Sequence, residues 1–262
     1  MPPRSLPTLE ARAVDKRYGP ALHACRGVSL AVRSGEVLGV VGESGSGKST
    51  LLRCLSGALR PDAGWIEADL PEPWRRRDIW SLDEASRAKA VRETISVVHQ
   101  NPRDGLRMEI TNGGNITEPL MARGDRHFGR LRDAALTWLD RVELPRSRID
   151  DYPAQLSGGM QQRLQIARAL ISSPRILLMD EPTGGLDVSV QAKLLDLLRK
   201  LVRELDIAVI LVTHDLAVVR MLADRLIVMR NGEVVESGLT DQVLDDPQHA
   251  YSQALIASAL RL

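Results

Sequence analysis

Short apolar runs and longer amphipathic segments alternate along this chain. The runs GEVLGVVG (35–42), RILLMD (175–180) and AVILVTH (208–214) are rich in Val, Ile and Leu, which is typical of strands buried on both faces of a parallel sheet. The segment between the last two runs repeats its apolar residues at helical spacing: Leu194, Leu195, Leu198, Leu201 and Val202. Strand and helix therefore alternate, which predicts an α/β fold with a mainly parallel central sheet.

Weaker patterns predict the other elements. Residues 8–14 and ISVVHQ (95–100) are interpreted as strands, and an Asn-Gly pair between apolar segments predicts a hairpin within 225–238. Residues 71–95 are basic and acidic by turns, which indicates a helical insertion on the surface. Residues 101–152 are polar, with helical spacing in LRDAALTWLDRVEL, and they predict a helical subdomain.

The length of 262 residues suits one large domain with a subdomain. We predict a core of residues 1–100 and 165–240 that includes an N-terminal antiparallel β part. A helical subdomain then covers residues 101–164, and a C-terminal helical tail covers residues 241–262. No segment is of low complexity, so the whole chain is expected to fold as this single unit.

Composition and charge indicate which partners and which cellular compartment to expect for the protein. The net charge of +1 gives no indication of a nucleic-acid partner. Cys25 and Cys54 lack metal-ligand spacing, and we expect free thiols in a reducing cytosol. The first residues, MPPRSLPTLEAR, contain no apolar signal segment, and the apolar runs are too short to cross a bilayer. We therefore expect a cytoplasmic protein that associates with membranes only through partner chains.

A glycine-rich loop follows the run at 35–42. It matches the pattern GxxxxGK[ST] in full and precedes an apolar helical segment, the context that this motif requires. The loop comprises Gly42, Glu43, Ser44, Gly45, Ser46, Gly47, Lys48, Ser49 and Thr50. Its backbone N–H groups are expected to surround phosphate oxygens, with Lys48 on the β- and γ-phosphates and the Ser49 hydroxyl on Mg²⁺.

Two acids end the buried run at 175–180. Asp180 is expected at the carboxyl edge of the sheet, where α/β proteins bind ligands, and would hold Mg²⁺. Glu181 points differently and could orient or deprotonate an attacking water. The alternative is a pair of acids that merely ends a strand at the surface, but the neighbouring phosphate loop favours the metal site.

A second glycine-rich helix start lies in LSGGMQQR (156–163). Ser157 can cap the helix, while Gly158 and Gly159 leave its first N–H groups open to an anion. An ordinary capped helix is the alternative. Taken one at a time, Gln100, His214 and Tyr18 have equally plain structural explanations, namely a solvated amide, a strand-end histidine and an exposed tyrosine.

Together and in order, these motifs resemble the ATP-binding cassette (ABC) ATPases, across roughly residues 8–240. The resemblance implies a P-loop fold and a head-to-tail dimer with two ATP molecules at its interface. Each ATP would lie between the loop Gly42–Thr50 of one copy and Ser157–Gly159 of the other. The resemblance also implies adenine stacking by Tyr18, Mg²⁺ contact by Gln100, base catalysis by Glu181, γ-phosphate contact by His214 and subunit bridging by Asp187.

Some segments resemble narrower groups within that family. VSVQAKLLDLL, LDDPQHAYSQAL and GEVVESG are similar to the dipeptide and oligopeptide importer ATPases. Three features differ: the loop TGGLD, the absence of a cysteine after Cys54, and VVHQNPRDGLR with GGNI. These features resemble the ATP-binding subunits of the bacterial phosphonate carbon–phosphorus lyase systems, whose partners are soluble lyase core subunits.

The resemblance therefore implies an ATPase that drives a conformational step in a phosphonate-degrading complex. The alternative is the ATPase of a peptide, nickel or phosphonate importer with membrane permease partners. Two details stay open. Gly184 and Gly185 suggest a positive-φ turn or a close approach by a partner backbone. Arg75–Arg77, beside Trp74 and Trp80, is either a solvated insertion or a contact patch.

Overall fold

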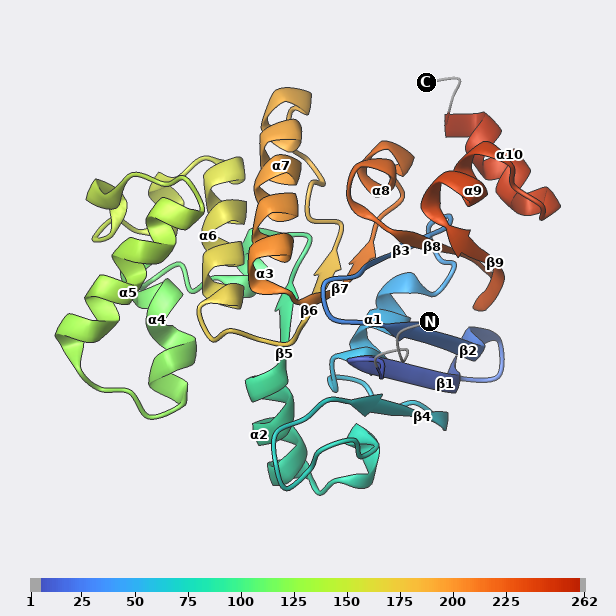
Figure 1. Ribbon diagram of the computed structural model, residues 1–262, viewed down its shortest axis with the longest axis horizontal. Coiled ribbons are helices and arrows are strands. Elements are labelled where there is room, and N and C mark those ends of the chain that lie inside the picture. The colour runs from blue at the N-terminus through green and yellow to red at the C-terminus, as the bar shows by residue number, and fades with distance from the viewer. Residues whose placement is uncertain (1–5, 260–262) are drawn as a thin grey trace.

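The structure, a computed structural model, describes residues 6–259 and contains a mainly parallel sheet (Figure 1). The strand order is β5-β6-β7-β3-β8-β9, and only β9 runs antiparallel to its neighbour. The strands are β3 (Val37–Val41), β5 (Ile95–Val98), β6 (Ile176–Asp180), β7 (Ala208–Val212), β8 (Arg225–Arg230) and β9 (Glu233–Leu239). The predicted α/β class with a mainly parallel sheet is confirmed, and the Asn-Gly pair lies in the β8–β9 turn.

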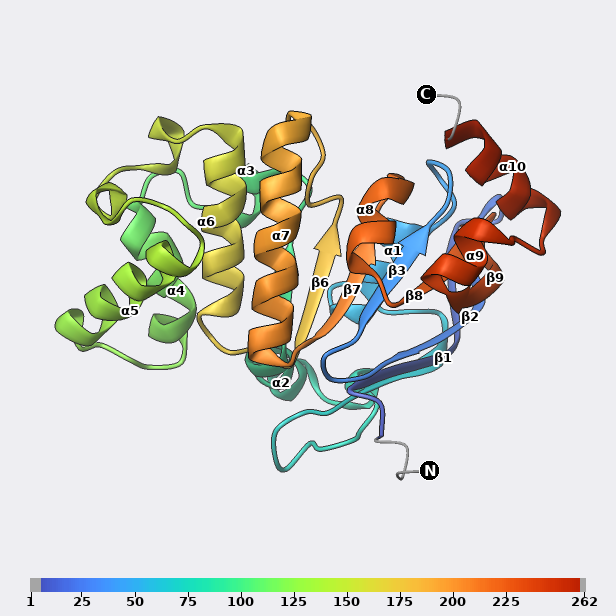
Figure 2. The same ribbon diagram turned by 45° about the horizontal axis from the view of Figure 1, so that its top comes forward.

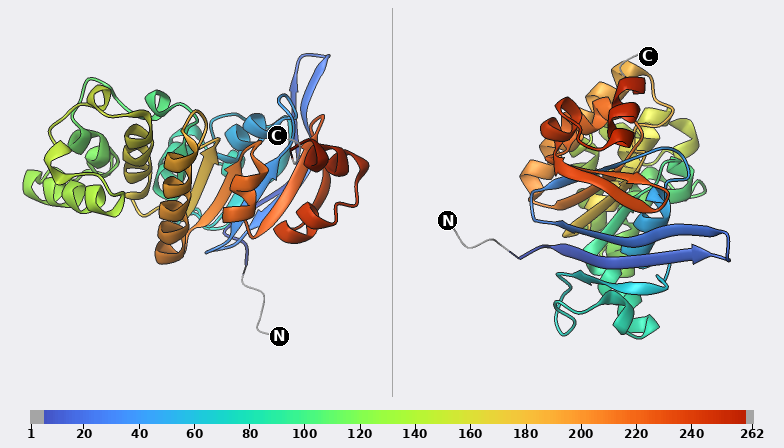
Figure 3. Two further views of the ribbon diagram at one scale, coloured as in Figure 1. Left: turned by 90° about the horizontal axis from the view of Figure 1, so that it is seen from above. Right: turned by 90° about the vertical axis from the view of Figure 1, so that its right-hand side faces the viewer.

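A second, antiparallel sheet packs beside the first. It has the order β2-β1-β4 and consists of β1 (Leu9–Tyr18), β2 (Leu22–Val32) and β4 (Ala63–Ala68). Helix α1 (Lys48–Leu55) lies between the two sheets (Figure 3). One hydrophobic core joins the helix and both sheets. Cys25 and Cys54 are buried in this core as free thiols. The predicted N-terminal antiparallel part is thus present, and it supports the helix that follows the glycine loop.

The other face of the large sheet is covered by helices. Figure 2 shows α6, α7 and α8 side by side over it, and a second hydrophobic core lies beneath them. These helices are α6 (Gly158–Leu170), α7 (Val188–Leu205) and α8 (Leu216–Leu222). The apolar face predicted for α7 is buried in that core. Because its leucines anchor α7 against the sheet, the loop between β6 and α7 is held at the carboxyl edge.

Two groups of helices lie at opposite ends of the molecule (Figure 3, left). One end holds α4 (Asn112–Ala122) and α5 (Phe128–Arg141), and the other holds α9 (Thr240–Asp245) and α10 (Ala250–Ala259). The short helix α3 (Pro102–Gly105) lies further in, against α6 and β5. These positions agree with the predicted helical subdomain and tail, whose exact boundaries stay predictions. The first five residues of the predicted core and the last three of the tail lie outside the described residues. In residues 6–259, no helix combines the length and apolarity that a bilayer crossing needs.

The structure corrects two sequence-based interpretations. The first strand extends to Tyr18 rather than ending at residue 14, because β2 pairs with it along its length through several irregularities in register. Residues 71–95 are not one helical insertion: α2 covers Glu84–Thr94, and a short 3₁₀ turn covers Ile79–Ser81. Pro71 and Pro73 lack backbone donors, so the segment that contains them cannot form a regular helix interior.

Candidate functional site: a phosphate loop facing two acids

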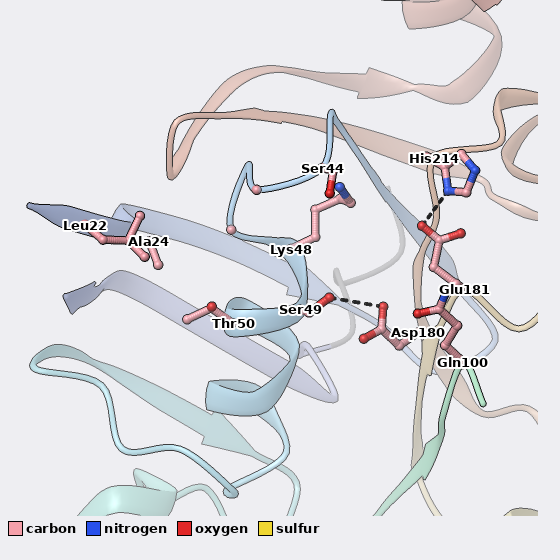
Figure 4. Close-up of a pocket in the computed structure, with 12 residues that line it drawn as sticks. Leu22, Ala24, Ser44, Lys48, Ser49, Thr50, Gln100, Asp180, Glu181 and His214 are labelled. Carbon is pink, nitrogen blue, oxygen red and sulfur yellow. Dashed lines mark hydrogen bonds and ion pairs between the residues drawn. The ribbon is translucent and has the colours of Figure 1, made fainter. Parts of the chain in front are cut away.

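A cavity of about 590 Å³ opens at the carboxyl edge of the parallel strands (Figure 4). Its walls come from the loop after β3, the start of α1, the ends of β5, β6 and β7, and strand β2. The lining residues are Leu22, Ala24, Ser44, Gly45, Gly47, Lys48, Ser49, Thr50, Gln100, Asp180, Glu181 and His214. The fold therefore brings four separate predicted motifs to one place.

The glycine loop has a shape that side chains would prevent. A Cβ atom on Gly47, whose φ is +104°, would lie 2.0 Å from the carbonyl oxygen of Ala24. A Cβ on Gly42 would lie 2.2 Å from the carbonyl oxygen of Met229. Both contacts are with backbone atoms, so a side chain at either position would force the main chain to move. A Cβ on Gly45, in contrast, would meet no atom within 4 Å, and this glycine faces the open cavity.

Lys48 closes this loop from the inside. Its ammonium group donates hydrogen bonds to the carbonyl oxygens of Gly42 (2.7 Å) and Glu43 (2.8 Å). Only 7% of the residue is exposed, and burial lowers the pKa of Lys48, although Glu181, Asp180 and Glu43 oppose the shift. A positive charge is thus held inside the loop, where it lines the cavity.

The N-terminus of α1 adds backbone donors to the same wall. Gly47 precedes the helix in a left-handed conformation and makes no side-chain cap. The N–H groups of Lys48, Ser49 and Thr50 begin the helix, where no intrahelical acceptor is available to them. These N–H groups and the partial positive charge of a helix N-terminus suit a bound phosphate.

Oxygen ligands lie opposite the loop. The Ser49 hydroxyl donates to Asp180 Oδ1 at 3.4 Å, and the Gln100 amide lines the same cavity. Burial raises the pKa of Asp180, while the Ser49 hydrogen bond opposes that shift. Among residues 6–259, no cluster of three or more His, Cys, Asp or Glu side chains could hold a metal. A hydroxyl, a carboxylate and an amide suit Mg²⁺, which keeps waters and shares substrate phosphates.

Glu181 is fixed beside His214. Its Oε1 atom lies 2.7 Å from His214 Nδ1, and Thr213 Oγ1 donates to Oε2 at 3.4 Å. The backbone of Glu181 adopts a φ of +46° and donates to the carbonyl of Val212 at 2.8 Å. This left-handed conformation turns the Glu181 side chain away from Asp180, so the two adjacent acids face different partners (Figure 4).

Four of the residues predicted to bind the nucleotide do not line the cavity, namely Tyr18, Gly42, Glu43 and Ser46, and two lining residues were not predicted. Tyr18 is 41% exposed and does not line the cavity, but it pairs in register with Leu22, which does. Leu22 and Ala24 belong to β2, a strand that the sequence pattern did not predict. The only sequence signal for this strand is the apolar–polar alternation in VSLAV, because Arg26 and Gly27 interrupt the pattern before it.

The second glycine motif is also outside the cavity of its own chain. Ser157 caps α6 as predicted, accepting a hydrogen bond from Met160 N at 3.4 Å. Ser157 and Gly158 are exposed, and none of Ser157–Gly159 lines the cavity. A Cβ on Gly159 would lie 2.5 Å from Val190, so this glycine lets α6 approach the start of α7.

The two glycines in the loop after Glu181 differ in backbone conformation. Gly185 has a φ of +74°, as the positive-φ hypothesis requires, whereas Gly184 is not in that region. A Cβ on Gly184 would lie 3.2 Å from the carbonyl oxygen of Glu181. Asp187 precedes α7, is exposed and makes no capping hydrogen bond.

Comparison with known proteins gives a consistent result. The family described as ABC transporter matches residues 25–184. PhnK of Escherichia coli (strain K12), whose name describes an ATP-binding protein for phosphonates utilization, is 54% identical over 255 residues, which are 97% of this chain and 98% of PhnK. The dipeptide transport ATP-binding protein DppD of Bacillus subtilis (strain 168) is 38% identical over 94% of this chain and 73% of its own length.

Solved structures share the fold. CbiO1 of Clostridium perfringens, part of the ABC transporter complex CbiONQ, superposes with a TM-score of 0.80 at 28% identity, covering 92% of this chain and 91% of CbiO1. The ATP-binding cassette MJ0796, in a dimeric structure bound to ADP and Pi, gives a TM-score of 0.77 at 34% identity, covering 88% of this chain and 98% of MJ0796.

Proposed function

The chain belongs to the ABC transporter family and is a nucleotide-binding ATPase of that family, and we propose that its ATP hydrolysis does conformational work in phosphonate utilization. One observation carries this proposal: the similarity to PhnK extends over nearly the full length of both chains at 54% identity. The oligopeptide and dipeptide transport relatives are 36–39% identical, and this chain spans 68–73% of their length. The proposed partners are the soluble core subunits of a carbon–phosphorus lyase complex.

We place the ATP phosphates in the loop Gly42–Thr50, between the N–H groups of α1 and the Lys48 ammonium. The support is the buried positive charge and the open wall at Gly45. Ser49, Asp180 and Gln100 are the proposed ligands of Mg²⁺. When bound, Mg²⁺ would neutralise charge on the β- and γ-phosphate oxygens. Tyr18 would stack on adenine from the tip of the β1–β2 hairpin, next to Leu22.

We assign the general base to Glu181. Its carboxylate would take a proton from the attacking water as the water adds to the γ-phosphorus and ADP leaves. His214, 2.7 Å from Oε1, would hold the carboxylate in place and contact the γ-phosphate. Gln100 would orient the same water and metal from the end of β5. The geometry supports these roles because three strand ends converge on one cavity.

The exposed start of α6 supports a dimer. Ser157, Gly158 and the first N–H groups of α6 would form an anion site, and they lie outside the cavity of their own chain. In a head-to-tail pair, this site of one copy would close on the γ-phosphate held by the other. The two dimeric structures of MJ0796 show that a related cassette forms dimers. Asp187, exposed beside this surface, would bridge the two copies, so closure would require ATP and hydrolysis would release it.

Growth tests the proposed function. In the source organism, deletion of the gene should abolish growth when a phosphonate is the only phosphorus source and leave growth on inorganic phosphate unchanged. The unmodified gene should restore growth, and the Lys48→Ala variant should not. Normal growth of the deletion strain on phosphonate, together with a lost ability to use peptides, would favour the importer alternative, which the similarity to DppD supports.

A further inference from the structure

The hydroxyl of Tyr251 reaches the phosphate loop from the C-terminal helix α10. It accepts a hydrogen bond from the backbone N–H of Glu43 at 3.0 Å, across a separation of 208 residues. Tyr251 is 7% exposed, and the guanidinium carbon of Arg230 lies 4.8 Å from the centre of its ring. The tyrosine is therefore enclosed and its hydroxyl has a defined position.

This contact acts on the same peptide group that Lys48 contacts. The peptide between Gly42 and Glu43 donates its N–H to Tyr251, and its carbonyl accepts from the Lys48 ammonium at 2.7 Å. Rotation of this peptide would break both hydrogen bonds together. Because Gly42 has no side chain to restrict its backbone, the orientation of this peptide depends on such contacts.

Helix α10 is itself firmly attached to the large sheet. The Glu236 carboxylate on β9 accepts from Gln248 N at 2.7 Å and from His249 N at 3.1 Å, just before the helix begins. His249 Nδ1 then accepts from Tyr251 N at 3.1 Å. Leu255 and Ile256 pack against the hydrophobic core that lies beneath α6, α7 and α8. Tyr251 is thus carried by a helix that is fixed to the sheet at its N-terminal end.

We propose that Tyr251 is a positioning residue for the nucleotide phosphates: its hydroxyl fixes the Gly42–Glu43 peptide so that the loop and Lys48 are preorganised for binding. The role deepens the ATP site described above and is independent of which complex the ATPase serves. Loss of the hydroxyl frees the peptide, and binding of phosphate then has to restore its orientation. The loss affects every nucleotide that has a β-phosphate, so the binding of ATP and the binding of ADP are weakened by the same factor.

The test compares Tyr251→Phe with Ser258→Ala. The first variant removes the hydroxyl and keeps the ring beside Arg230. The second also removes a hydroxyl from α10, but one that is exposed and bonded only within the helix, to Leu255 O at 2.7 Å. Isothermal titration of the full chain should show Kd values for ATP and ADP about 2- to 10-fold higher in Tyr251→Phe, the loss of one hydrogen bond. Ser258→Ala should bind as the unmodified protein does.

Steady-state kinetics separates positioning from general destabilisation. In Tyr251→Phe, KM for ATP should rise by the same factor while kcat stays within about twofold, because the lost interaction serves binding. Unchanged Kd values in Tyr251→Phe, with or without a lowered melting temperature, would overturn the positioning role. If the unmodified protein itself failed to bind ATP, the ATPase assignment would be contradicted as well, so the two failures are distinguishable in the same titration.

Discussion

Replacing Glu181 with Gln removes one negative charge and keeps the shape of the side chain. The carboxylate contacts His214 at 2.7 Å and Thr213 at 3.4 Å, and the amide of Gln can preserve both contacts. The variant therefore loses its base with little change in packing. Removal of a positioned base lowers rates by about 10²–10⁴, which corresponds to about 2.7–5.4 kcal/mol of activation free energy. We expect kcat for ATP hydrolysis to fall within this range.

The assay measures the rate of phosphate release, the affinity for ATP and the oligomeric state of the protein. Glu181→Gln should bind ATP at least as tightly as the unmodified protein, because one carboxylate near the phosphates is gone. With ATP and Mg²⁺, it should elute as a dimer in size-exclusion chromatography, since closure occurs and hydrolysis does not. Glu109→Gln is the matched control: it removes the same charge from an exposed loop outside the cavity and should leave kcat unchanged. Turnover by Glu181→Gln within about tenfold of the unmodified rate would refute the assignment of the base.

Three further outcomes follow from the site and the core. Lys48→Ala should weaken ATP binding about 10- to 100-fold, the loss of a charge-assisted hydrogen bond; an unchanged Kd in titration calorimetry would contradict the phosphate assignment. Gly185→Ala should lower the free energy of unfolding in urea by about 1 kcal/mol, because Ala is strained at a φ of +74°. The added Cβ would meet no atom within 4 Å, so backbone strain is the whole expected effect, and equal stability of the two proteins would disprove it. Burial raises the pKa of Cys25 to about 12 and that of Cys54 to about 11, so at pH 8 iodoacetamide should label neither thiol until the protein is unfolded, and rapid labelling of the native chain would contradict their burial.

The sequence predicted those elements in which the local pattern of apolar residues matches the way the element is buried in the fold. The runs that became β3, β6 and β7 are apolar on both faces because each lies inside the sheet, and the glycine loop has a fixed spacing. Strand β2 was missed because its pattern is interrupted near Gly27, where its register with β1 shifts. The contact of Tyr251 with Glu43 was out of reach for a different reason: it joins residues at opposite ends of the chain, and no local period encodes it.

The residues of the candidate site also fall into those that local sequence fixes and those that depend on distant segments. Lys48, Ser49 and Asp180 were predicted because a strand end and a helix start fix them locally, and they do line one cavity. Leu22 and Ala24 enter that cavity only because the antiparallel sheet folds over α1, which depends on packing between distant segments. The roles of Ser157 and Asp187 depend on a second copy of the chain, and they stay predictions.

The central proposal is that ATP hydrolysis by this protein drives a conformational step in phosphonate utilization, together with soluble partner subunits. Its most direct test is affinity purification of the tagged full-length chain from the source organism, grown with a phosphonate as the only phosphorus source. Glu181→Gln, which is expected to hold the ATP-closed dimer, should retain the partners best. We predict that soluble carbon–phosphorus lyase subunits co-purify, and that they are lost from the Lys48→Ala variant. Recovery of membrane permease subunits without any lyase subunit would contradict the claim.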